Sequence, residues 1–367
     1  MFTKQNKYQN HTYFMRLALD QAKRVLGKTK DNPGVGCVIT KDNNVISAGY
    51  TSINGRPHAE QNAINFSKIN LKNSQLYVTL EPCSHYAKTP PCINAIMNKK
   101  IKKVFFSIND PDPRSFNKCS NKLRKSGIKV NNGISKNKIN SFYRSYHKLK
   151  KKKLPFVTCK LAISKDYYTI DKNNKWITNK FSRGRVHLMR SYHDCIITSS
   201  KTIIHDNAKL TCRIDGLGDR SPSRIILDNK LKIPIKSTII KEASNYPTII
   251  FYNKNNKRKV KLLKKLKIKI CKIPLDNKGE IDLIKSLIKA KELGFSRILL
   301  ESGIKLVTNF LNKNLIDDFI IFMSNKNLTK NGDGNVKKYY RLFFNSKKKT
   351  KEKVNLFGDK LISYKLK

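Results

Sequence analysis

Four residues in the first third of the chain have the types and spacing needed for zinc-dependent hydrolysis. His58 and Glu60 lie two positions apart in PHAEQNAI, and Cys83 and Cys92 belong to the later stretch PCSHYAKTPPC. Catalytic zinc is usually held by three protein ligands, with a fourth position left for water. One imidazole and two thiolates would complete that set and leave Glu60 to move a proton. This chemistry is hydrolytic deamination at an aminopyrimidine-like carbon.

Simpler interpretations of the same residues exist. Cysteine is among the residues most often buried, so a core histidine with two core cysteines is one alternative. A zinc module with a purely structural role is another, but it would need four closed ligands and only three are evident. The general signature of zinc deaminases is H-x-E followed by P-C-x-x-C. Here eight residues separate the two cysteines, so only the first half of that signature matches.

The elements that carry these residues follow from the hydrophobic pattern. A helix beginning near Pro57 would carry His58 and Glu60, and a second helix would begin at PPC, with prolines in its first turn. The positive ends of two adjacent helices would favour thiolates. Alternation of strands and helices predicts an α/β layered unit with largely parallel strands in its later part. The supporting segments are an amphipathic helix at 13–26, a hairpin of strands at 34–40 and 45–51, and strands in SQLYVTLEPC and IKKVFFSIND.

Length and composition favour two cytoplasmic domains. A chain of 367 residues exceeds one ordinary core, and a basic run at 148–153 separates an expected domain 1–150 from a second α/β domain, 151–367. The net charge of +52 comes mostly from lysines spread along the chain, so basic runs such as 148–155 and 256–269 indicate solvated faces or linkers, and no nucleic acid is expected. We expect the lysine-rich stretch 346–353 to face solvent. Neither a membrane span nor a disulfide framework is predicted.

The loop between the two cysteines closely resembles that of a known family. PCSHYAKTPPC is similar to the pattern P-C-S-H-x-G-x-T-P-P-C of the bifunctional deaminase–reductases of riboflavin biosynthesis, with Ala87 in place of glycine. NPGVGCVI resembles the N-P-N-V-G-C-V-I of the same family. The resemblance implies that Asn32 lines the pyrimidine pocket and that His85 contacts or supports the substrate. Taken alone, Asn32 would equally suit a turn and His85 the surface.

The second domain resembles the reductase half of that family, which has a dihydrofolate-reductase-like fold. No G-x-G-x-x-G follows a strand, so a Rossmann domain is not indicated. SRILLESG predicts a strand and a glycine turn that opens a helix, where backbone N–H groups suit a cofactor phosphate. The stretches that carry the resemblance are KLAIS, WIT, LMRSYHDCIITSSKTIIHDNAKLTCR, RIILDN and LLESGIKLVTNFL.

The resemblance also implies ligand contacts for this second domain. The guanidinium forks of Arg190 and Arg213 suit a substrate phosphate. The sequence departs from the family at Tyr167, at Asn174 and at Asn207–Ala208. Substrate contacts are implied for Asn174, Arg190, Leu210, Arg213 and Glu301. NADPH contacts are implied for Ala162, Trp176, Thr202, Asp206, Asn229, Gly303, Ile304, Lys305, Leu306, Val307, Thr308 and Asn309.

Together these observations predict a cytoplasmic, two-step riboflavin-biosynthesis enzyme. One Zn²⁺ per chain would support deamination of a phosphorylated diaminopyrimidinone in a cytidine-deaminase-like three-layer domain. NADPH would then reduce its ribosyl group to ribityl in the second domain. A nucleic-acid base deaminase of the tRNA type is the alternative, because it would share His58, Glu60 and both cysteines, but it needs no reductase half. The sequence leaves the oligomeric state open, a homo-oligomer included.

Overall fold

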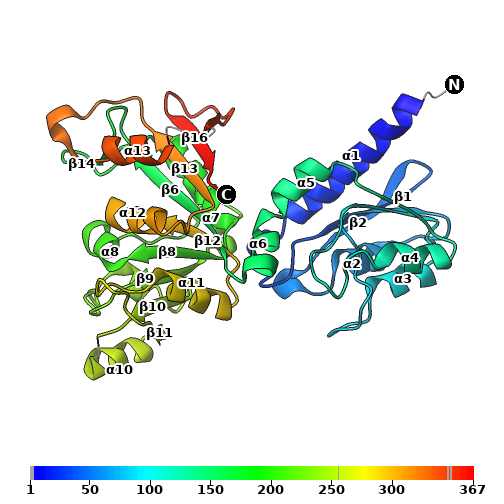
Figure 1. The fold of residues 1–367 in the computed structure, drawn as a ribbon, viewed down its shortest axis with the longest axis horizontal. Helices are drawn as coiled ribbons and strands as arrows, with labels where there is room; N and C mark the ends of the chain where they lie inside the picture. The colour runs from blue at the N-terminus through cyan, green and yellow to red at the C-terminus, as the bar shows by residue number, and fades with distance from the viewer. Residues whose placement is uncertain (1–3, 255, 345–346, 348) are drawn as a thin grey trace. The chain divides into compact units, whose positions relative to one another are not determined.

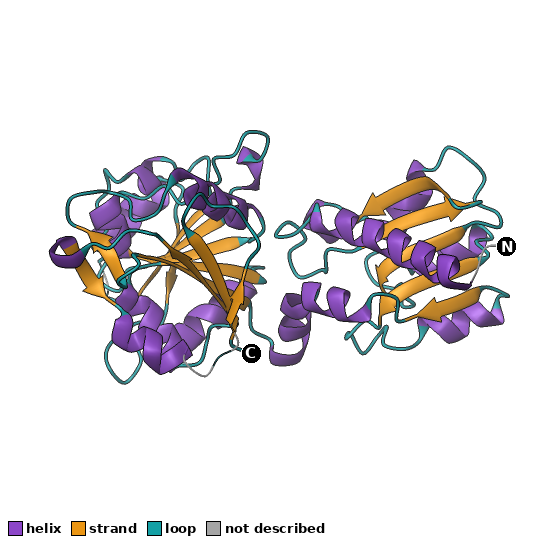
Figure 2. Cartoon of the chain, turned by 90° about the horizontal axis from the view of Figure 1, so that it is seen from above, coloured by secondary structure: helices purple, strands orange, loops and turns teal. Residues whose placement is uncertain are grey.

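The computed structural model describes residues 4–254, 256–344, 347 and 349–367, and the chain divides into two compact units, 1–153 and 154–367. Both units are α/β, as the sequence predicts (Figures 1 and 2). The expected boundary after residue 150 lies within helix α6 (Arg144–Lys152). That basic run is therefore no linker, because Leu149 and Tyr146 are buried beneath its lysines.

The N-terminal unit is a five-stranded sheet in the order β2-β1-β3-β4-β5. Strands β3, β4 and β5 are parallel, whereas β1 is antiparallel to both of its neighbours. The later strands are therefore parallel, as predicted. The strands are β1 (Gly36–Lys41), β2 (Asn44–Tyr50), β3 (Gln75–Leu80), β4 (Lys103–Ile108) and β5 (Lys129–Asn132); the helices are α1 (Lys4–Lys23), α2 (Ala59–Phe66), α3 (Cys92–Asn98), α4 (Cys119–Lys125), α5 (Lys136–Phe142) and α6.

Two glycines allow helices to pack closely on both faces of this sheet. A Cβ at Gly36 would collide with the backbone of Ala18 in α1, and a Cβ at Gly49 would collide with the backbone of Ala63 in α2. Gly49 pairs with Cys37, the residue next to Gly36, so the two glycines point to opposite faces. Helices α1 and α2 therefore cover opposite sides, which makes the unit a three-layer structure.

The C-terminal unit is built on a nine-stranded sheet in the order β11-β10-β9-β8-β12-β6-β13-β16-β15. Strands from β11 to β13 are parallel, and β16 is antiparallel to both β13 and β15. The strands are β6 (Phe156–Ile163), β7 (Tyr168–Asp171), β8 (Cys195–Ser199), β9 (Ser223–Leu227), β10 (Thr248–Tyr252), β11 (Lys269–Lys272), β12 (Arg297–Glu301), β13 (Asp318–Met323), β14 (Gly332–Asn335), β15 (Lys349–Lys351) and β16 (Lys360–Lys365); β7 and β14 form a separate pair.

Helices cover the strands of this second sheet (Figure 2). They are α7 (Lys180–Ser191), α8 (Ser200–Asp206), α9 (Thr238–Lys241), α10 (Lys257–Lys265), α11 (Leu283–Glu292), α12 (Ile304–Asn312) and α13 (Lys337–Phe344). Alternate residues of one strand enter different cores: Ile197 lies in one and Ile196 in the other. Strands buried on both faces explain the continuous apolar runs in this half of the sequence.

Two details of the surface bear on the sequence-based expectations. None of the helices in the described part of the chain combines the length and apolar character that a bilayer crossing requires. The lysine-rich stretch 346–353 lies partly outside the described residues, and residues 347 and 349–353 are exposed.

Candidate active sites

His58, Cys83 and Cys92 converge where two helices begin. His58 immediately precedes α2, Cys92 is the first residue of α3, and Cys83 lies in the loop after β3. The Nδ1 atom of His58 lies 3.5 Å from Sγ of Cys83 and 3.3 Å from Sγ of Cys92. One ligand atom from each of the three residues lies within 4.8 Å of the others. The structure thus brings together the three ligands expected from the sequence.

The spacing of these atoms suits a zinc ion. Zinc–nitrogen bonds of about 2.0–2.1 Å and zinc–sulfur bonds of about 2.3 Å at tetrahedral angles would separate nitrogen from sulfur by roughly 3.6 Å. The observed separations are 3.5 Å and 3.3 Å. Hydrogen bonds from the Cys92 thiol and from His58 lower the pKa of Cys83 to about 4, although burial opposes this. Three ligands, with a thiolate favoured at Cys83, match a catalytic zinc site whose fourth position is taken by water.

Glu60 lies in the first turn of α2, two residues after His58, and only 3% of it is exposed. Burial raises the pKa of its carboxyl to about 7, while the neighbouring His58 partly offsets this rise. A carboxyl group with that pKa can both accept and return a proton near neutral pH. The geometry and the electrostatics therefore suit Glu60 for general acid–base chemistry.

A buried carboxylate organises the loop beside the metal ligands. Glu81 accepts hydrogen bonds from the backbone N–H groups of Asp110, Asn117 and Cys119, at 3.2, 3.0 and 3.0 Å. That loop carries Ser115, whose hydroxyl lies 2.9 Å from Nδ1 of His85. The sequence analysis did not identify Glu81, although its position just before Pro82 and Cys83 could have indicated a residue close to the metal ligands.

Asn32 lies against the loop that leads into His58. A Cβ added at Gly55 would collide with the Asn32 side chain, so Asn32 sits directly over Gly55. Gly55 has a φ of 92° and precedes His58 by three residues. Asn32 therefore packs against the loop that leads into His58.

The second site centres on the buried carboxylate of Glu301 at the end of β12. Arg190 donates to both of its oxygens, from Nε at 2.7 Å and from Nη2 at 3.0 Å. The Nζ atom of Lys160 lies 3.6 Å from the same carboxylate. Burial would raise the pKa of Glu301, but Arg190 and Lys160 outweigh it and lower the pKa to about 2. Glu301 is therefore an anion at neutral pH.

The segment 209–213 packs against this cluster. Arg190 also donates from Nη1 to the carbonyl of Thr211 at 2.9 Å. Leu210 is buried and has a φ of 56°, which orients the backbone that follows it. Arg213 is exposed, and its backbone N–H donates to Nδ1 of His187 at 3.2 Å. Arg190 thus directs its N–H groups at Glu301 and Thr211, whereas Nη1 of the exposed Arg213 donates to the hydroxyl of Thr211 at 3.4 Å.

The helix starts of α8 and α12 form a second part of this site. The hydroxyl of Thr202 in α8 lies 3.2 Å from that of Ser302, next to Gly303, the residue that caps α12. Strands β8 and β12 are parallel neighbours, so the helices that follow them begin at the same edge. Among the described residues, none is a hydrogen-bond partner of the buried Oδ1 atom of Asn229. Exposed N–H groups and an unpartnered acceptor fit a phosphorylated nicotinamide cofactor.

The remaining expected cofactor and substrate residues are less tightly held. Ala162 is half-buried on β6, and Asp206 is exposed at the end of α8. Trp176 is 53% exposed, with the guanidinium of Arg183 5.0 Å from its ring centre. Asn174 is exposed and donates to Asp171 at 3.0 Å, so the structure does not bring it into the Glu301 cluster.

Two residues of the reductase cluster were missed from the sequence, Lys160 and His187. Lys160 lies on β6 two positions before Ala162 and therefore on the same face. Burial lowers the pKa of His187, and the charges of Arg190 and Arg213 lower it further, to about 4. Its ring is therefore neutral at pH 7. The spacing of two residues between Lys160 and Ala162 on a strand could have pointed to Lys160. No pattern in the sequence indicated His187.

Comparisons with known proteins agree with this division of sites. The model of the cytidine and deoxycytidylate deaminase zinc-binding region matches residues 8–108, and the model of the RibD C-terminal domain matches residues 155–336. The riboflavin biosynthesis protein RibD of Aquifex aeolicus is 32% identical over 357 residues, which are 96% of this chain and 97% of that protein. The chain belongs to the RibD family.

Other RibD proteins and structures extend this result. RibD of Escherichia coli is 29% identical over 335 residues, covering 88% of this chain and 89% of the relative. The solved structure of a diaminohydroxyphosphoribosylaminopyrimidine deaminase/5-amino-6-(5-phosphoribosylamino)uracil reductase from Thermotoga maritima is 30% identical, covers 98% of this chain and 99% of its own, and has a TM-score of 0.83. A RibD structure from Acinetobacter baumannii has a TM-score of 0.81 at 27% identity, with 98% and 99% coverage. The chain therefore carries both domains of the family, and the predicted fold classes are confirmed.

Proposed function

We propose that this chain catalyses two consecutive steps of riboflavin biosynthesis. The N-terminal unit hydrolytically deaminates 2,5-diamino-6-(5-phosphoribosylamino)pyrimidin-4(3H)-one. The C-terminal unit then reduces the ribosyl group of the product to ribityl, which gives 5-amino-6-(5-phosphoribitylamino)uracil. The observation that carries the proposal is the convergence of His58, Cys83 and Cys92 beside the buried Glu60, in a chain that also contains a RibD reductase domain.

In the deaminase unit, His58, Cys83 and Cys92 hold the metal and Glu60 moves protons. Zinc held by these three residues would lower the pKa of a bound water to about 7. The Glu60 carboxylate takes the proton from the attacking water and delivers it to the amino group that leaves. Asn32 and His85 orient the pyrimidine, and Ser115 holds the His85 ring through its Nδ1 atom.

In the reductase unit, charged side chains position the ribosyl phosphate against the cofactor. NADPH supplies the hydride. Arg213 contacts the substrate phosphate, while Glu301 and Lys160 face the sugar. Thr202, Asp206, Asn229 and the start of α12 bind the cofactor, with Trp176, Ala162 and the segment 303–309 completing its site. Arg190 keeps Glu301 ionised and holds the carbonyl of Thr211.

Finer assignments rest on the same reasoning. We infer NADPH as the nicotinamide cofactor, a small phosphorylated pyrimidine in preference to nucleic acid as the partner, and a cytoplasmic location. The reductase half supports the small-molecule substrate, because a nucleic-acid deaminase has no use for it. The positive charge is spread along the chain, with 77 Lys and Arg against 25 Asp and Glu.

The decisive experiment incubates the purified protein with the diaminopyrimidine substrate, with and without NADPH, and analyses the products by mass spectrometry. Without NADPH we expect a product in which oxygen replaces an amino group. With NADPH that product should also gain a hydride and a proton. Absence of the deaminated product, together with stable tRNA binding at physiological salt, would favour the nucleic-acid alternative instead.

A further inference from the structure

Arg224 is a fully buried cation in the reductase unit, with no solvent exposure at all. It lies on β9, and its carboxylate partner is distant, since Nη1 is 4.0 Å from Oε2 of Glu242. The other oxygen of Glu242 accepts instead from Nζ of Lys209, at 2.8 Å. Burial lowers the pKa of Arg224 to about 10, so the guanidinium still carries its charge at neutral pH. The ion pair with Glu242 is therefore long, and the hydrogen bonds of this arginine go mainly to other groups.

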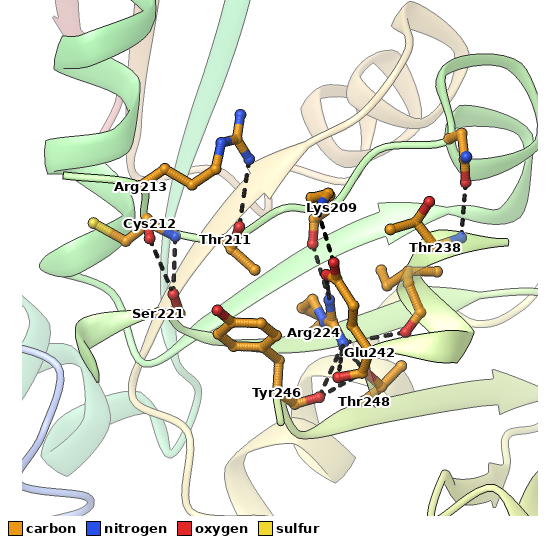
Figure 3. Close-up of polar contacts among 12 residues, drawn as sticks. Lys209, Thr211, Cys212, Arg213, Ser221, Arg224, Thr238, Glu242, Tyr246 and Thr248 are labelled. Atoms are coloured by element: carbon orange, nitrogen blue, oxygen red, sulfur yellow. Dashed lines mark hydrogen bonds and ion pairs between the residues drawn. The ribbon is translucent and has the colours of Figure 1, made fainter. Parts of the chain in front are cut away.

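The guanidinium of Arg224 donates hydrogen bonds to backbone carbonyls from separate parts of the chain (Figure 3). Its Nη1 donates to the carbonyl of Lys209 at 3.0 Å. Its Nη2 donates to the carbonyls of Ile239 and Tyr246 at 3.1 and 3.0 Å, and its Nε donates to the hydroxyl of Thr248 at 3.1 Å. Because the fork is planar and rigid, these contacts fix the carbonyl of Lys209 relative to α9 and β10.

Lys209 opens the segment that ends at Arg213, and the chain in and just before this segment is held at several further points. The side chain of Asn207 accepts from the backbone N–H of Thr238 at 2.9 Å, and the hydroxyl of Ser221 accepts from the N–H of Cys212 at 3.0 Å. Arg190 holds the carbonyl of Thr211 from the other side. Figure 3 shows Arg224 below Lys209, with Arg213 farther along the same segment.

We propose that Arg224 is a positioning residue for the reductase substrate: it anchors the backbone at Lys209 so that Arg213 reaches the substrate phosphate. The proposal rests on the assigned role of Arg213 in the proposed function. Arg224 itself touches neither substrate nor cofactor.

The test is the variant Arg224→Lys in the full-length protein. A single ammonium keeps the charge but cannot reach Lys209 and the carbonyls of Ile239 and Tyr246 together. We expect the KM for the deaminated intermediate to rise about ten- to a hundredfold, since small displacements of a binding group have effects of this size. The KM for NADPH and the deaminase rate should each stay within about threefold of the parent values. A change of that size is smaller than the effect expected from displacing a binding group. An unchanged KM for the intermediate would overturn the proposal.

A matched control separates backbone anchoring from charge pairing. Lys209→Met removes the ion pair with Glu242 but keeps the carbonyl that Arg224 holds, so its KM for the intermediate should match the parent. If Lys209→Met raised this KM as much as Arg224→Lys, the anchoring role would be wrong. A second route avoids changing the arginine: Thr248→Val removes the hydroxyl that orients its Nε, and it should raise the same KM to a smaller extent.

Coupling with Arg213 distinguishes a positioning role from a structural one. In an Arg213→Ala background, Arg224→Lys should add little to the KM, because the group that it positions is already gone. Additive effects, or a loss of kcat with both KM values unchanged, would indicate a structural role and overturn the proposal. Amide hydrogen exchange gives an independent readout: exchange across residues 210–213 should accelerate in Arg224→Lys and not in Lys209→Met. This measurement decides the anchoring even if the parent fails to reduce the intermediate, which would overturn the proposed function alone.

Discussion

Two buried glutamates show how neighbouring side chains decide the role of a carboxyl group. Glu60 and Glu301 are 3% and 6% exposed, so burial raises the pKa of each. At Glu60 burial is the dominant cause, and the pKa rises to about 7. At Glu301 the charges of Arg190 and Lys160 dominate, and the pKa falls to about 2. Glu60 can therefore exchange protons near neutral pH, whereas Glu301 remains a fixed anion.

The first prediction at the residue scale concerns Glu60. Glu60→Gln keeps the shape of the side chain but cannot accept the proton of the attacking water. We expect deaminase activity to fall by at least about 10²–10⁴-fold, the usual contribution of a general acid–base group. Metal analysis should still find one zinc per chain. A variant with activity close to that of the parent would make Glu60 an ordinary first-turn carboxylate of α2.

The second prediction separates Arg213 from Asp206 in the reductase unit. Arg213→Ala removes a charge-assisted contact to the substrate phosphate worth about 1.5–3 kcal/mol, so the KM for the deaminated intermediate should rise roughly ten- to a hundredfold. Asp206→Ala should instead weaken NADPH binding and leave the KM for the intermediate nearly unchanged. Steady-state kinetics with each substrate varied in turn measures both effects. Normal kinetics in both variants would remove these residues from the site.

At the scale of elements, ion pairs and backbone contacts tie strands to helices that lie far apart in the sequence. Glu301 at the end of β12 is joined to Arg190 in α7, and Arg190 in turn holds the loop at Thr211. In the N-terminal unit, Tyr146 and Lys150 of α6 bond to Asp110 and Asp112 in the loop that carries Ser115, each at 2.9 Å. Helices remote in sequence therefore fix the loop of the expected contact Arg213 and the loop whose Ser115 bonds to His85.

The third prediction is the pH dependence that the Glu301–Arg190 pair gives to stability. The folded-state pKa of Glu301 is about 2, below its ordinary value of 4.5, so the pair stabilises the reductase unit above about pH 4.5. As the pH falls through this range toward 2, protonation removes roughly 2–3 kcal/mol of unfolding free energy. Urea unfolding at a series of pH values should show this loss. Glu301→Gln should be less stable at neutral pH and should have a flatter pH profile in that range; an equally steep profile would contradict the assignment.

At the scale of the whole molecule, one chain carries two chemistries in two compact units, 1–153 and 154–367. Each unit has its own sheet and its own buried core. The expected zinc ligands all belong to the first unit, and the expected NADPH contacts all belong to the second. Hydride transfer needs no metal, so the two activities should be separable.

The fourth prediction is selective loss of deamination when the metal is removed. Chelation of zinc should stop deamination while reduction of supplied deaminated intermediate continues at the parent rate. Cys83→Ser should have the same effect, because loss of one thiolate from three ligands leaves the metal weakly held. Metal analysis and the two separate assays measure this result. If reduction failed along with deamination, the units would not be independent.

The sequence by itself predicted the candidate zinc ligands, the acid–base candidate and the α/β class of both halves. These features depend on local patterns: His58 and Cys92 lie at helix starts that proline and hydrophobic periodicity reveal. The tertiary structure decided how the reductase residues are used. The Arg190–Glu301 pair joins residues 111 positions apart, and the buried Arg224 donates to carbonyls 15 and 22 positions away. A lysine-rich composition makes no single cation conspicuous, and only folding decides which of them leave water and what they then contact.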